Sequence, residues 1–462
     1  MDRSVRSLSL LALSVLVIPS AKAQPFRYVQ TLTASDTADG DLFGTLVDLD
    51  GDIAIVRSRA AYGEYETSPQ THVFEFSAGQ FVETDIIAFP DLFQDGGFYT
   101  GQESAIDNGV IVNGQSFGYQ RAGIRGITFA EKTNPGWDWK SLTTDSQDRL
   151  RIHQEYRQGL RAVSRSVAIS NGVVVAGDLA GEAKVTGQQG VVHFFEQSSA
   201  GAWKWGGLIQ PDGPTEPVYG YSVAIDNNTV VATTKPFPHA SQQPAAHFFE
   251  RQPDGSWQES AKFQYDISTG GFGALFFEIS GDTAIGRTEN ELLVYERRNT
   301  PDPVTGNLWE QTATLPQTRV NSLSKSATID GNLIAVTTLD PVASAEYFEA
   351  IDFLRANPGL ADVVIPERPT PQIDLYRRNA SGDWQLAQSL HSPDLDYADT
   401  FGASLALDNG RLLIGAANAN DQQNQPGAAF LFMVVPEPSA AALLTLSAFT
   451  CSCLSRSSHG RA

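Results

Sequence analysis

One acidic stretch has the residue types of a metal site. In Asp48-Leu-Asp50-Gly-Asp52, carboxylates alternate around a glycine. Calcium loops need several oxygen ligands at alternate positions and a glycine for the sharp turn. The chain continues with Ile53-Ala-Ile55, which brings no later acidic ligand. The stretch therefore has two interpretations: a calcium site formed by Asp48, Asp50 and Asp52, or a hairpin turn with surface acids, which we favour.

Three histidines stand in similar tetrapeptides. His72 begins His-Val-Phe-Glu, and His193 and His247 each begin His-Phe-Phe-Glu. Residues at equivalent places of a repeat lie on different repeat units, so these three cannot meet at one metal ion. We expect them to pack within the fold. Trp203 and Trp205 could form a sugar-stacking patch, but tryptophan recurs at that place of the repeat and favours a structural role.

The sequence contains no recognisable catalytic motif. The two cysteines, Cys451 and Cys453, stand near the C-terminal end, which excludes a cysteine nucleophile or cysteine metal site in the body. No nucleophile elbow, phosphate loop, His-Glu-x-x-His or nucleotide fingerprint is present. We therefore assign no catalytic or cofactor-binding residue. Carboxylates are plentiful, so a hydrolase that uses paired acids stays open.

The charge balance restricts the partners. The 462 residues include 53 Asp and Glu against 32 Lys and Arg, a net charge of -21. Nucleic-acid binding needs a basic face that neutralises phosphates, so no nucleic-acid partner is expected.

A strand-turn-strand unit recurs along the chain. In Tyr219–Ala232, apolar residues alternate with small ones, Asp226-Asn-Asn228 has turn chemistry, and a β-branched run follows. The equivalent turn positions are Asp50, Asp107, Ser170, Asp226, Ser280, Asp330 and Asp408. Seven turns of this kind predict seven repeat units.

Each unit has signals for two further strands. The third strand carries the His-Phe-Phe-Glu type of segment, and the fourth begins at a tryptophan that follows a polar turn: Trp203, Trp257, Trp309 and Trp384. Four short strands per unit are typical of a β-propeller blade. The sequence thus predicts an all-β fold, a seven-bladed β-propeller of four-stranded antiparallel blades.

The two ends of the propeller should meet in one blade. The last unit, from Phe401, has three strands, and Phe26–Thr33 resembles a fourth strand without the three before it. We expect this N-terminal strand to pair beside Ala428–Met433 and complete the last blade, which leaves no open sheet edge.

The N-terminal residues have the pattern of a secretory signal. Arg3 and Arg6 precede an apolar run, and Ala21-Lys-Ala23 has the small residues of a cleavage site. The predicted domains are a signal peptide at 1–23, the propeller at 24–434 and a C-terminal segment at 435–462.

The repeats resemble a known family. Phe43-Gly44, Tyr219-Gly220, Phe401-Gly402 and Gly415-Ala416 resemble the motifs of FG-GAP repeats, over roughly residues 26–433. The resemblance implies a seven-bladed propeller like that of integrin α-subunits, in which calcium binds between the first two strands.

The C-terminal segment resembles the PEP-CTERM sorting signal. Pro436, Glu437 and Pro438 precede the apolar run Ala440–Leu454, which is short for a transmembrane helix, and a basic tail follows. The resemblance implies processing by an exosortase, transient membrane association and a Gram-negative-type bacterium that often makes extracellular polysaccharide.

Two stretches do not fit a plain blade. Residues 145–159 are polar and suit a loop or short helix. Residues 343–371 contain an apolar pattern at 346–355 that predicts an amphipathic helix, with or without a functional role.

The expected function is a binding or structural role in the cell envelope or extracellular matrix, with polysaccharide or envelope proteins as partners. The alternative is a secreted carbohydrate-active hydrolase or lyase. That alternative requires two or three carboxylates gathered at the propeller axis.

Overall fold

The computed structural model describes residues 25–36, 42–58, 70–88, 103–114, 127–134, 136–141, 163–178, 190–199, 201–211, 219–234, 243–265, 276–288, 291–316, 325–357, 366–367, 369–395, 400–417 and 426–434. Two compact units divide the chain: Arg27–Met433, and a second unit of Met1–Phe26 with Val434–Ala462. The first unit contains the body of the sheets and is the subject below.

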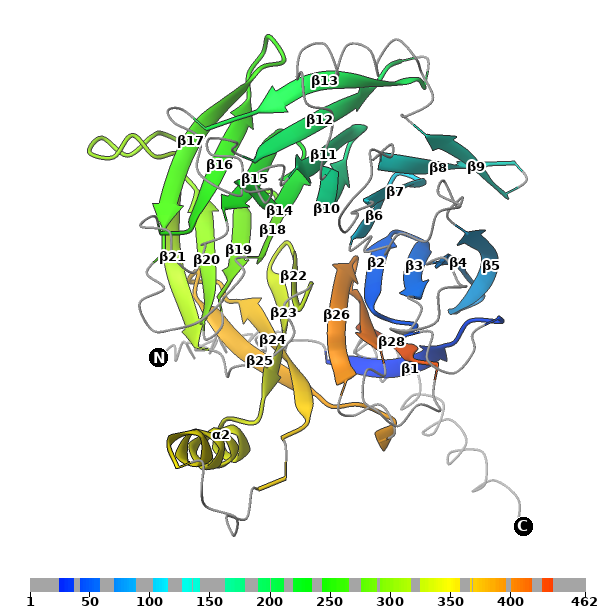
Figure 1. Ribbon diagram of the computed structural model, residues 1–462, viewed down its shortest axis with the longest axis vertical. Coiled ribbons are helices and arrows are strands. Elements are labelled where there is room, and N and C mark those ends of the chain that lie inside the picture. The colour runs from blue at the N-terminus through cyan, green and yellow to red at the C-terminus, as the bar shows by residue number, and fades with distance from the viewer. Residues whose placement is uncertain are drawn as a thin grey trace, which may run out of the picture. The chain divides into compact units, whose positions relative to one another are not determined.

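The described strands form seven four-stranded sheets around one axis (Figure 1). The innermost strand of each sheet contacts the innermost strand of the next sheet, and β26 contacts β2, so the ring is closed. The innermost strands of blades 1 to 7 are β2 (Leu46–Asp50), β6 (Ser104–Asp107), β10 (Val163–Ser170), β14 (Tyr219–Asp226), β18 (Phe276–Ser280), β22 (Ala327–Asp330) and β26 (Phe401–Asp408).

The second and third strands lie progressively farther from the axis. The second strands are β3 (Ile53–Ser58), β7 (Val110–Gly114), β11 (Val173–Asp178), β15 (Thr229–Thr234), β19 (Thr283–Arg287), β23 (Leu333–Leu339) and β27 (Arg411–Ala416). The third strands are β4 (Gln70–Ser77), β8 (Ile127–Thr133), β12 (Val191–Gln197), β16 (Ala245–Arg251), β20 (Glu291–Arg297), β24 (Pro371–Arg378) and β28 (Ala428–Val434).

The outermost strands confirm the predicted closure. Blades 1 to 6 take β5 (Gln80–Ala88), β9 (Gly136–Ser141), β13 (Trp203–Ile209), β17 (Trp257–Gln264), β21 (Trp309–Pro316) and β25 (Trp384–Leu390). Blade 7 takes the N-terminal strand β1 (Phe26–Leu32), which pairs with β28. Each of the four predicted tryptophans is the first residue of its strand. The all-β, seven-bladed architecture is therefore confirmed.

The turn between the first and second strands explains its own composition. The residue after the turn position has a positive φ, 51° at Asn227 and 53° at Gly51. Asparagine and glycine tolerate that conformation better than other residues do. The turn can therefore stay short, and the second strand pairs directly with the first.

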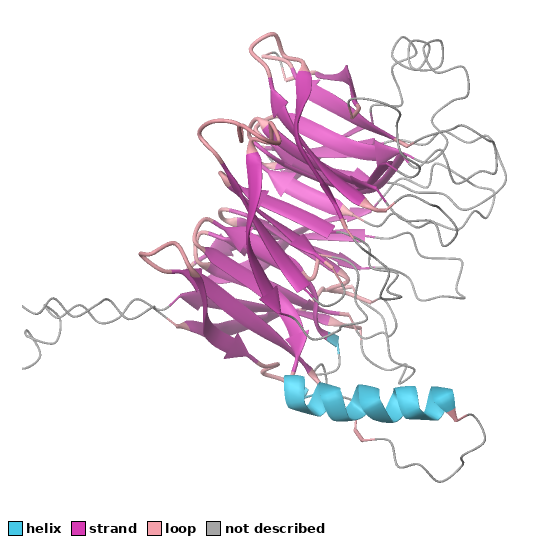
Figure 2. Cartoon of the chain, turned by 90° about the vertical axis from the view of Figure 1, so that its left-hand side faces the viewer, coloured by secondary structure: helices cyan, strands magenta, loops and turns pink. Residues whose placement is uncertain are grey.

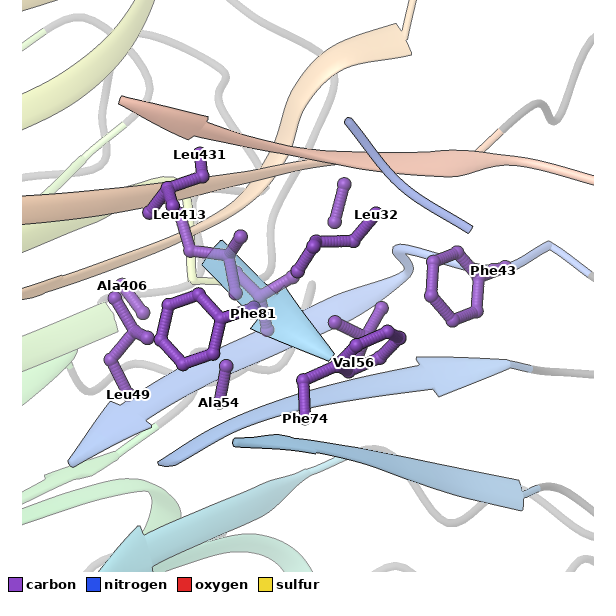
Figure 3. Packing of buried hydrophobic residues seen from close by; sticks show 12 residues of the cluster. Leu32, Phe43, Leu49, Ala54, Val56, Phe74, Phe81, Ala406, Leu413 and Leu431 are labelled. Carbon is purple, nitrogen blue, oxygen red and sulfur yellow. The ribbon is translucent and has the colours of Figure 1, made fainter. Parts of the chain in front are cut away.

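The apolar core lies between neighbouring blades. Side chains of a strand alternate between its two faces, and both faces of a blade pack on another blade. One cluster joins blade 7 to blade 1 and includes Leu32 of β1, Phe43, Phe74 and Leu431, all nearly inaccessible (Figure 3).

The predicted insertion contains the helix α2 (Pro341–Ala356), which follows β23 (Figure 2). It begins before the predicted residue 346 because Asp340 caps it: the Asp340 carboxylate accepts hydrogen bonds from the amides of Val342 and Ala343, each 2.9 Å long. Within the described part of the chain, no helix is both long and apolar enough to cross a bilayer.

Several predictions lie outside the described residues. These are the signal peptide with Ala21 and Ala23, the triplet Pro436–Pro438, the apolar run 440–454 and the polar stretch 145–159.

Candidate functional site

The seven turn residues form a ring of hydrogen bonds that passes from blade to blade. Each turn side chain accepts a bond from a backbone N–H in the turn of the next blade. The N···O distances are 2.8 Å for Asp107 with Asn171, 3.0 Å for Ser170 with Asn227, 2.6 Å for Asp226 with Gly281, 3.0 Å for Ser280 with Gly331, 2.9 Å for Asp330 with Asn409 and 2.7 Å for Asp408 with Gly51. Asp50 accepts from the amides of Asn108 and Gly109. We call these seven residues the turn ring.

The turn ring explains why Asp or Ser recurs at this position. A local turn would accept many residues, but an acceptor that reaches the next blade requires a short oxygen-bearing side chain. Burial raises the pKa of Asp50, Asp107 and Asp330, and the backbone hydrogen bonds oppose that rise. The sequence predicts turns at these positions, whereas their contact between blades is visible only in the structure.

The aromatic-glycine motif also lies between blades. Gly44 has a φ of 89°, and a Cβ there would stand 2.3 Å from the Ala428 carbonyl oxygen of blade 7. Its partner is Gly415, where a Cβ would stand 2.1 Å from the Gly44 oxygen. Gly220 meets Gly177 in the same way, with 1.8 Å from a Gly177 Cβ to the Gly220 oxygen. The paired glycines therefore allow two backbones to approach closely.

Gly177 has the role of the Gly-Ala half of the motif, which the sequence pattern indicated only at Gly415-Ala416. In the structure, Gly177 lies seven residues after its turn residue Ser170, as Gly415 does after Asp408, although its order is Ala176-Gly177. The position of the glycine decides its role, and its alanine neighbour can lie on either side.

Farther from the axis, the glutamates of the third strands bind the next blade. Glu75 pairs with Lys132 at 2.9 Å, Glu296 pairs with Arg378 at 2.6 Å, and Glu196 pairs with Arg251. Glu250 accepts hydrogen bonds from Arg297 Nε at 3.2 Å and from Trp309 Nε1 at 2.9 Å. We call these contacts the rim pairs.

Four ionisable side chains that do not repeat come together near the axis. Asp48 is on β2, Glu103 precedes β6, Glu278 is on β18 and Lys325 precedes β22. Lys325 Nζ lies 3.5 Å from Asp48 Oδ2, and the charges of Glu278 and Glu103 also act on this ammonium group. Since the four residues belong to blades 1, 2, 5 and 6, they can meet only near the axis. We call them the axial cluster.

Each carboxylate of the axial cluster also binds the next blade. Asp48 accepts from the amide of Ile106 at 3.0 Å, and Glu103 accepts from that of Val167 at 3.1 Å. Glu278 accepts from Thr328 and from the amide of Ile329. These bonds favour the charged carboxylates and orient them.

Glu278 has a pKa that lies near neutrality. Burial raises its pKa to about 7, and the nearby Lys325 ammonium opposes the rise. For Lys325, burial lowers the pKa, but Asp48, Glu278 and Glu103 outweigh it and raise the pKa above its usual value. A carboxyl that titrates near neutrality can give or take a proton, which general acid-base chemistry requires.

The axial cluster could not be found from the repeat. Small residues such as Ala105, Ala224 and Ala406 stand two residues before their turn residues, where Asp48 and Glu278 stand before theirs. An acid at a position that is otherwise small is the one signal available, and it names neither Lys325 nor Glu103.

The three candidate calcium ligands are held in different directions. Asp48 binds Lys325 and Ile106, Asp50 binds the turn of blade 2, and Asp52 pairs with Arg411 of blade 7 at 2.9 Å. This geometry does not fit one shared calcium ion, which needs oxygen ligands that converge. Calcium binding by Asp48, Asp50 and Asp52 stays a prediction.

The repeated histidines pack inside their blades, as expected. His72 Nδ1 lies 2.8 Å from Glu83 Oε1, and His247 Nδ1 lies 2.8 Å from Glu259 Oε1. All three side chains are buried, and Trp205 donates its Nε1–H to His193.

Trp203 is also buried. It stacks on Phe129 with ring centroids 4.6 Å apart and donates to Glu131 at 2.8 Å. The structure therefore gives Trp203 an internal role and not one in a sugar-stacking patch.

A comparison with protein families finds the FG-GAP repeat at residues 26–74 and 384–432. Each match begins at an outermost strand, β1 or β25, and continues through three strands of the following blade. The sequence repeat is thus displaced from the blade by one strand, which is why β1 has to close the ring. A search of the curated proteins finds no match.

Solved structures that resemble the chain share little sequence with it. A Lactobacillus plantarum protein is 10% identical with a TM-score of 0.38, covering 80% of this chain and 96% of that one. A chain in a Saccharomyces cerevisiae structure of Dbp5 bound to Nup159, Gle1, IP6 and ADP is 7% identical with a TM-score of 0.40, covering 90% and 98%. The phage phi92 endosialidase is 9% identical with a TM-score of 0.42, covering 88% and 69%.

The family matches and the seven blades agree with each other. The matched segments include Phe43-Gly44 and Phe401-Gly402, whose glycines contact the neighbouring blade. The chain is therefore a seven-bladed β-propeller, two segments of which match the FG-GAP repeat.

Proposed function

We propose that the chain is secreted and sorted to the cell envelope of a Gram-negative-type bacterium, where the propeller has a binding or structural, adhesion-like role. The observation that carries this proposal is the arrangement of the sequence. A signal-type segment, 1–23, and a sorting-type segment with Pro436-Glu-Pro438 flank an FG-GAP propeller. Its partners are an exosortase-type protease and either extracellular polysaccharide or envelope proteins.

The contacts between blades support a scaffold role. In the turn ring and the rim pairs, polar side chains of the repeats bind neighbouring blades to each other. A rigid frame of this kind is what binding loops require, because their affinity depends on preorganisation.

The first experiment concerns the two ends of the chain. In a host with an exosortase, the released protein should begin near Gln24 and should lack the residues after the triplet, as measured by intact mass. A variant with Pro436→Ala, Glu437→Ala and Pro438→Ala should keep its tail and stay with the membranes. A cytoplasmic protein with both ends intact would refute the proposal.

A second experiment concerns the ligand. The full chain is screened against bacterial polysaccharides and envelope proteins, and the bound polysaccharide is then analysed for its chain length. Binding without shortening supports the adhesion-like role. Shortening of the polysaccharide supports the alternative, a carbohydrate-active hydrolase or lyase.

The alternative has one observation in its favour, the axial cluster with Glu278 titrating near neutrality. If Glu278 is a general acid or base, Glu278→Gln should lower polysaccharide cleavage by about 100-fold or more. Asp374→Asn is the matched control, since Asp374 is another partly buried acid, on β24, whose pKa burial raises. Equal activity of the two variants would remove Glu278 from that role.

A further inference from the structure

Asp36, His72 and Glu83 form a cluster at the interface between blade 7 and blade 1, which we call the seam. In the described part of the chain, they are a group of three metal-ligating residues whose ligand atoms all lie within 4.8 Å of one another. His72 Nδ1 lies 2.8 Å from Glu83 Oε1 and 3.8 Å from Asp36 Oδ1. Asp36 follows β1, the strand that closes blade 7, whereas His72 and Glu83 are on β4 and β5 of blade 1.

The atoms behind the ligands hold them in place. His72 Nε2 lies 3.3 Å from Ser58 Oγ, and Glu83 Oε2 accepts the backbone N–H of Ser35 at 2.8 Å. Metal-ligating histidines use their second ring nitrogen in this way, and the partner fixes the ring orientation and tautomer. Nδ1 is therefore the nitrogen that faces the two carboxylates.

A second histidine-glutamate pair in the chain shows which part of the cluster belongs to the packing of a blade. His247 and Glu259 repeat the pair of His72 and Glu83 at the same 2.8 Å separation. The histidine-glutamate pair by itself therefore belongs to the blade. The feature that the seam adds is Asp36, whose carboxylate also faces His72.

The distances suit a small divalent ion after a slight adjustment. Ligand bonds of 2.0–2.1 Å in a tetrahedral site place neighbouring ligand atoms about 3.3 Å apart. The distances of 2.8 Å and 3.8 Å at His72 Nδ1 lie on either side of that value. Asp36 is 40% exposed and His72 is fully buried, so an ion can enter from the Asp36 side.

The ligand set selects the class of metal. One imidazole nitrogen with two carboxylates suits Zn²⁺ and its neighbours, whereas Ca²⁺ and Mg²⁺ prefer oxygen alone. Binding to a neutral His72 moves the ring proton from Nδ1 to Nε2. Ser58 then accepts that hydrogen bond, since a hydroxyl can donate or accept.

We propose that Asp36, His72 and Glu83 bind a divalent transition metal of the Zn²⁺ class and that this metal clamps the closing strand to the first blade. The clamp fixes the segment after β1 to β4 and β5 of blade 1, while β1 itself pairs with β28 of blade 7. The metal would therefore hold blade 1 and blade 7 together across the seam. A metal that binds the folded ring and not the unfolded chain should raise the free energy of unfolding, by an amount that grows with the logarithm of the free metal concentration above the Kd.

The test uses the full chain, without a histidine tag, and Zn²⁺ alone as the probe. Calorimetric titration of the wild type should give one site, and Zn²⁺ should raise the melting temperature. Asp36→Asn keeps the size of an exposed side chain and should weaken Zn²⁺ binding by at least about 10-fold. Co²⁺ should give visible absorption bands in the wild type and lose them in this variant.

Asp394→Asn is the matched control. Asp394 follows β25 as Asp36 follows β1, and it is exposed, but Phe430 of β28 stands where His72 stands in β4. This variant should bind Zn²⁺ like the wild type. The proposal is overturned if the wild type does not bind Zn²⁺, or if Asp36→Asn and Asp394→Asn bind it equally well, which would place the ion outside the cluster of Asp36, His72 and Glu83.

Discussion

Blade 4, which is continuous in sequence, and blade 7, which is built from both ends of the chain, have the same strand order. In blade 4, β14 to β17 follow one another, whereas in blade 7 the outermost strand β1 precedes β26 by most of the chain. The turn ring makes the same contact from both blades. Asp226 accepts the backbone N–H of Gly281 in blade 5 at 2.6 Å, and Asp408 accepts the backbone N–H of Gly51 in blade 1 at 2.7 Å. The turn-ring contacts are therefore the same in a blade that is continuous in sequence and in a blade that is built from both ends of the chain.

Blades 4 and 7 differ in the side-chain pairs that bind them to the next blade. Blade 4 uses its third-strand Glu250 to bind Arg297 of blade 5. At the seam, Arg411 of the second strand takes over: it pairs with Asp52, binds the Gly51 carbonyl and lies 4.1 Å above the Phe76 ring. The seam thus combines the common ring of backbone contacts with side chains of its own. The comparison teaches that ring closure depends on the repeat near the axis and on local solutions at the rim.

Deletion of β1 should have the largest effect. Without residues 26–32, β28 becomes an open edge and the cluster around Leu32 is exposed, so we expect loss of cooperative unfolding and aggregation. A peptide of residues 25–34 added in trans should restore the melting transition, whereas a scrambled peptide should not. A deleted chain that melts like the wild type would break the comparison.

Substitutions in the turn ring should cost less and cost the same at both places. Asp226→Ala and Asp408→Ala each remove one acceptor for a turn amide, at about 1–2 kcal/mol of unfolding free energy. The two changes should be additive because the sites are far apart. Urea denaturation measures both, with the Asn variants as controls that keep an acceptor. A much larger loss for Asp408→Ala would mean that the seam depends on this ring more than other interfaces do.

The axial cluster predicts a pH-dependent difference. The Glu278 pKa is about 7 in the folded chain and near 4.5 in the unfolded chain, so its protonated form stabilises the fold below pH 4.5. That contribution is lost as the pH rises through about 7. Glu278→Gln should therefore gain stability relative to the wild type between pH 5 and pH 8, on the order of 1 kcal/mol. Melting curves measured across this range give the difference, and a flat difference would refute the shifted pKa.

The rim should show the smallest effects and a preference for the seam. Arg251→Ala removes a pair with Glu196 that is partly solvent-exposed, at about 0.5 kcal/mol. Arg411→Ala removes the pair with the exposed Asp52, the hydrogen bond to the Gly51 carbonyl and the contact with the Phe76 ring, at about 1 kcal/mol. Urea denaturation of both variants in one buffer tests the order. If Arg251→Ala costs more, the seam has no special contact at its rim.

The local pattern of the chain was sufficient for the architecture. Alternating apolar residues, the Asp-Asn and Asp-Gly turns and the tryptophans that open the fourth strands are short-range signals, and each predicts one strand or turn by itself. Their repetition gave the number of blades, and the unmatched strand at 26–33 gave the closure. The helix in the 343–371 insertion followed from the same local reasoning, except that its cap at Asp340 moved its start.

Only the tertiary structure decided which side chains meet. Asp48 and Lys325 are far apart in sequence. They reach each other because the innermost strands of blades 1 and 6 both lie beside the axis. Asp36 reaches His72 because β1 is the outermost strand of blade 7 and the segment that follows it lies beside blade 1. The repeat specifies how one blade folds, through contacts between near neighbours in the chain. The candidate sites form where the closed ring brings side chains of different blades together. A local sequence pattern does not specify the distance between side chains of different blades.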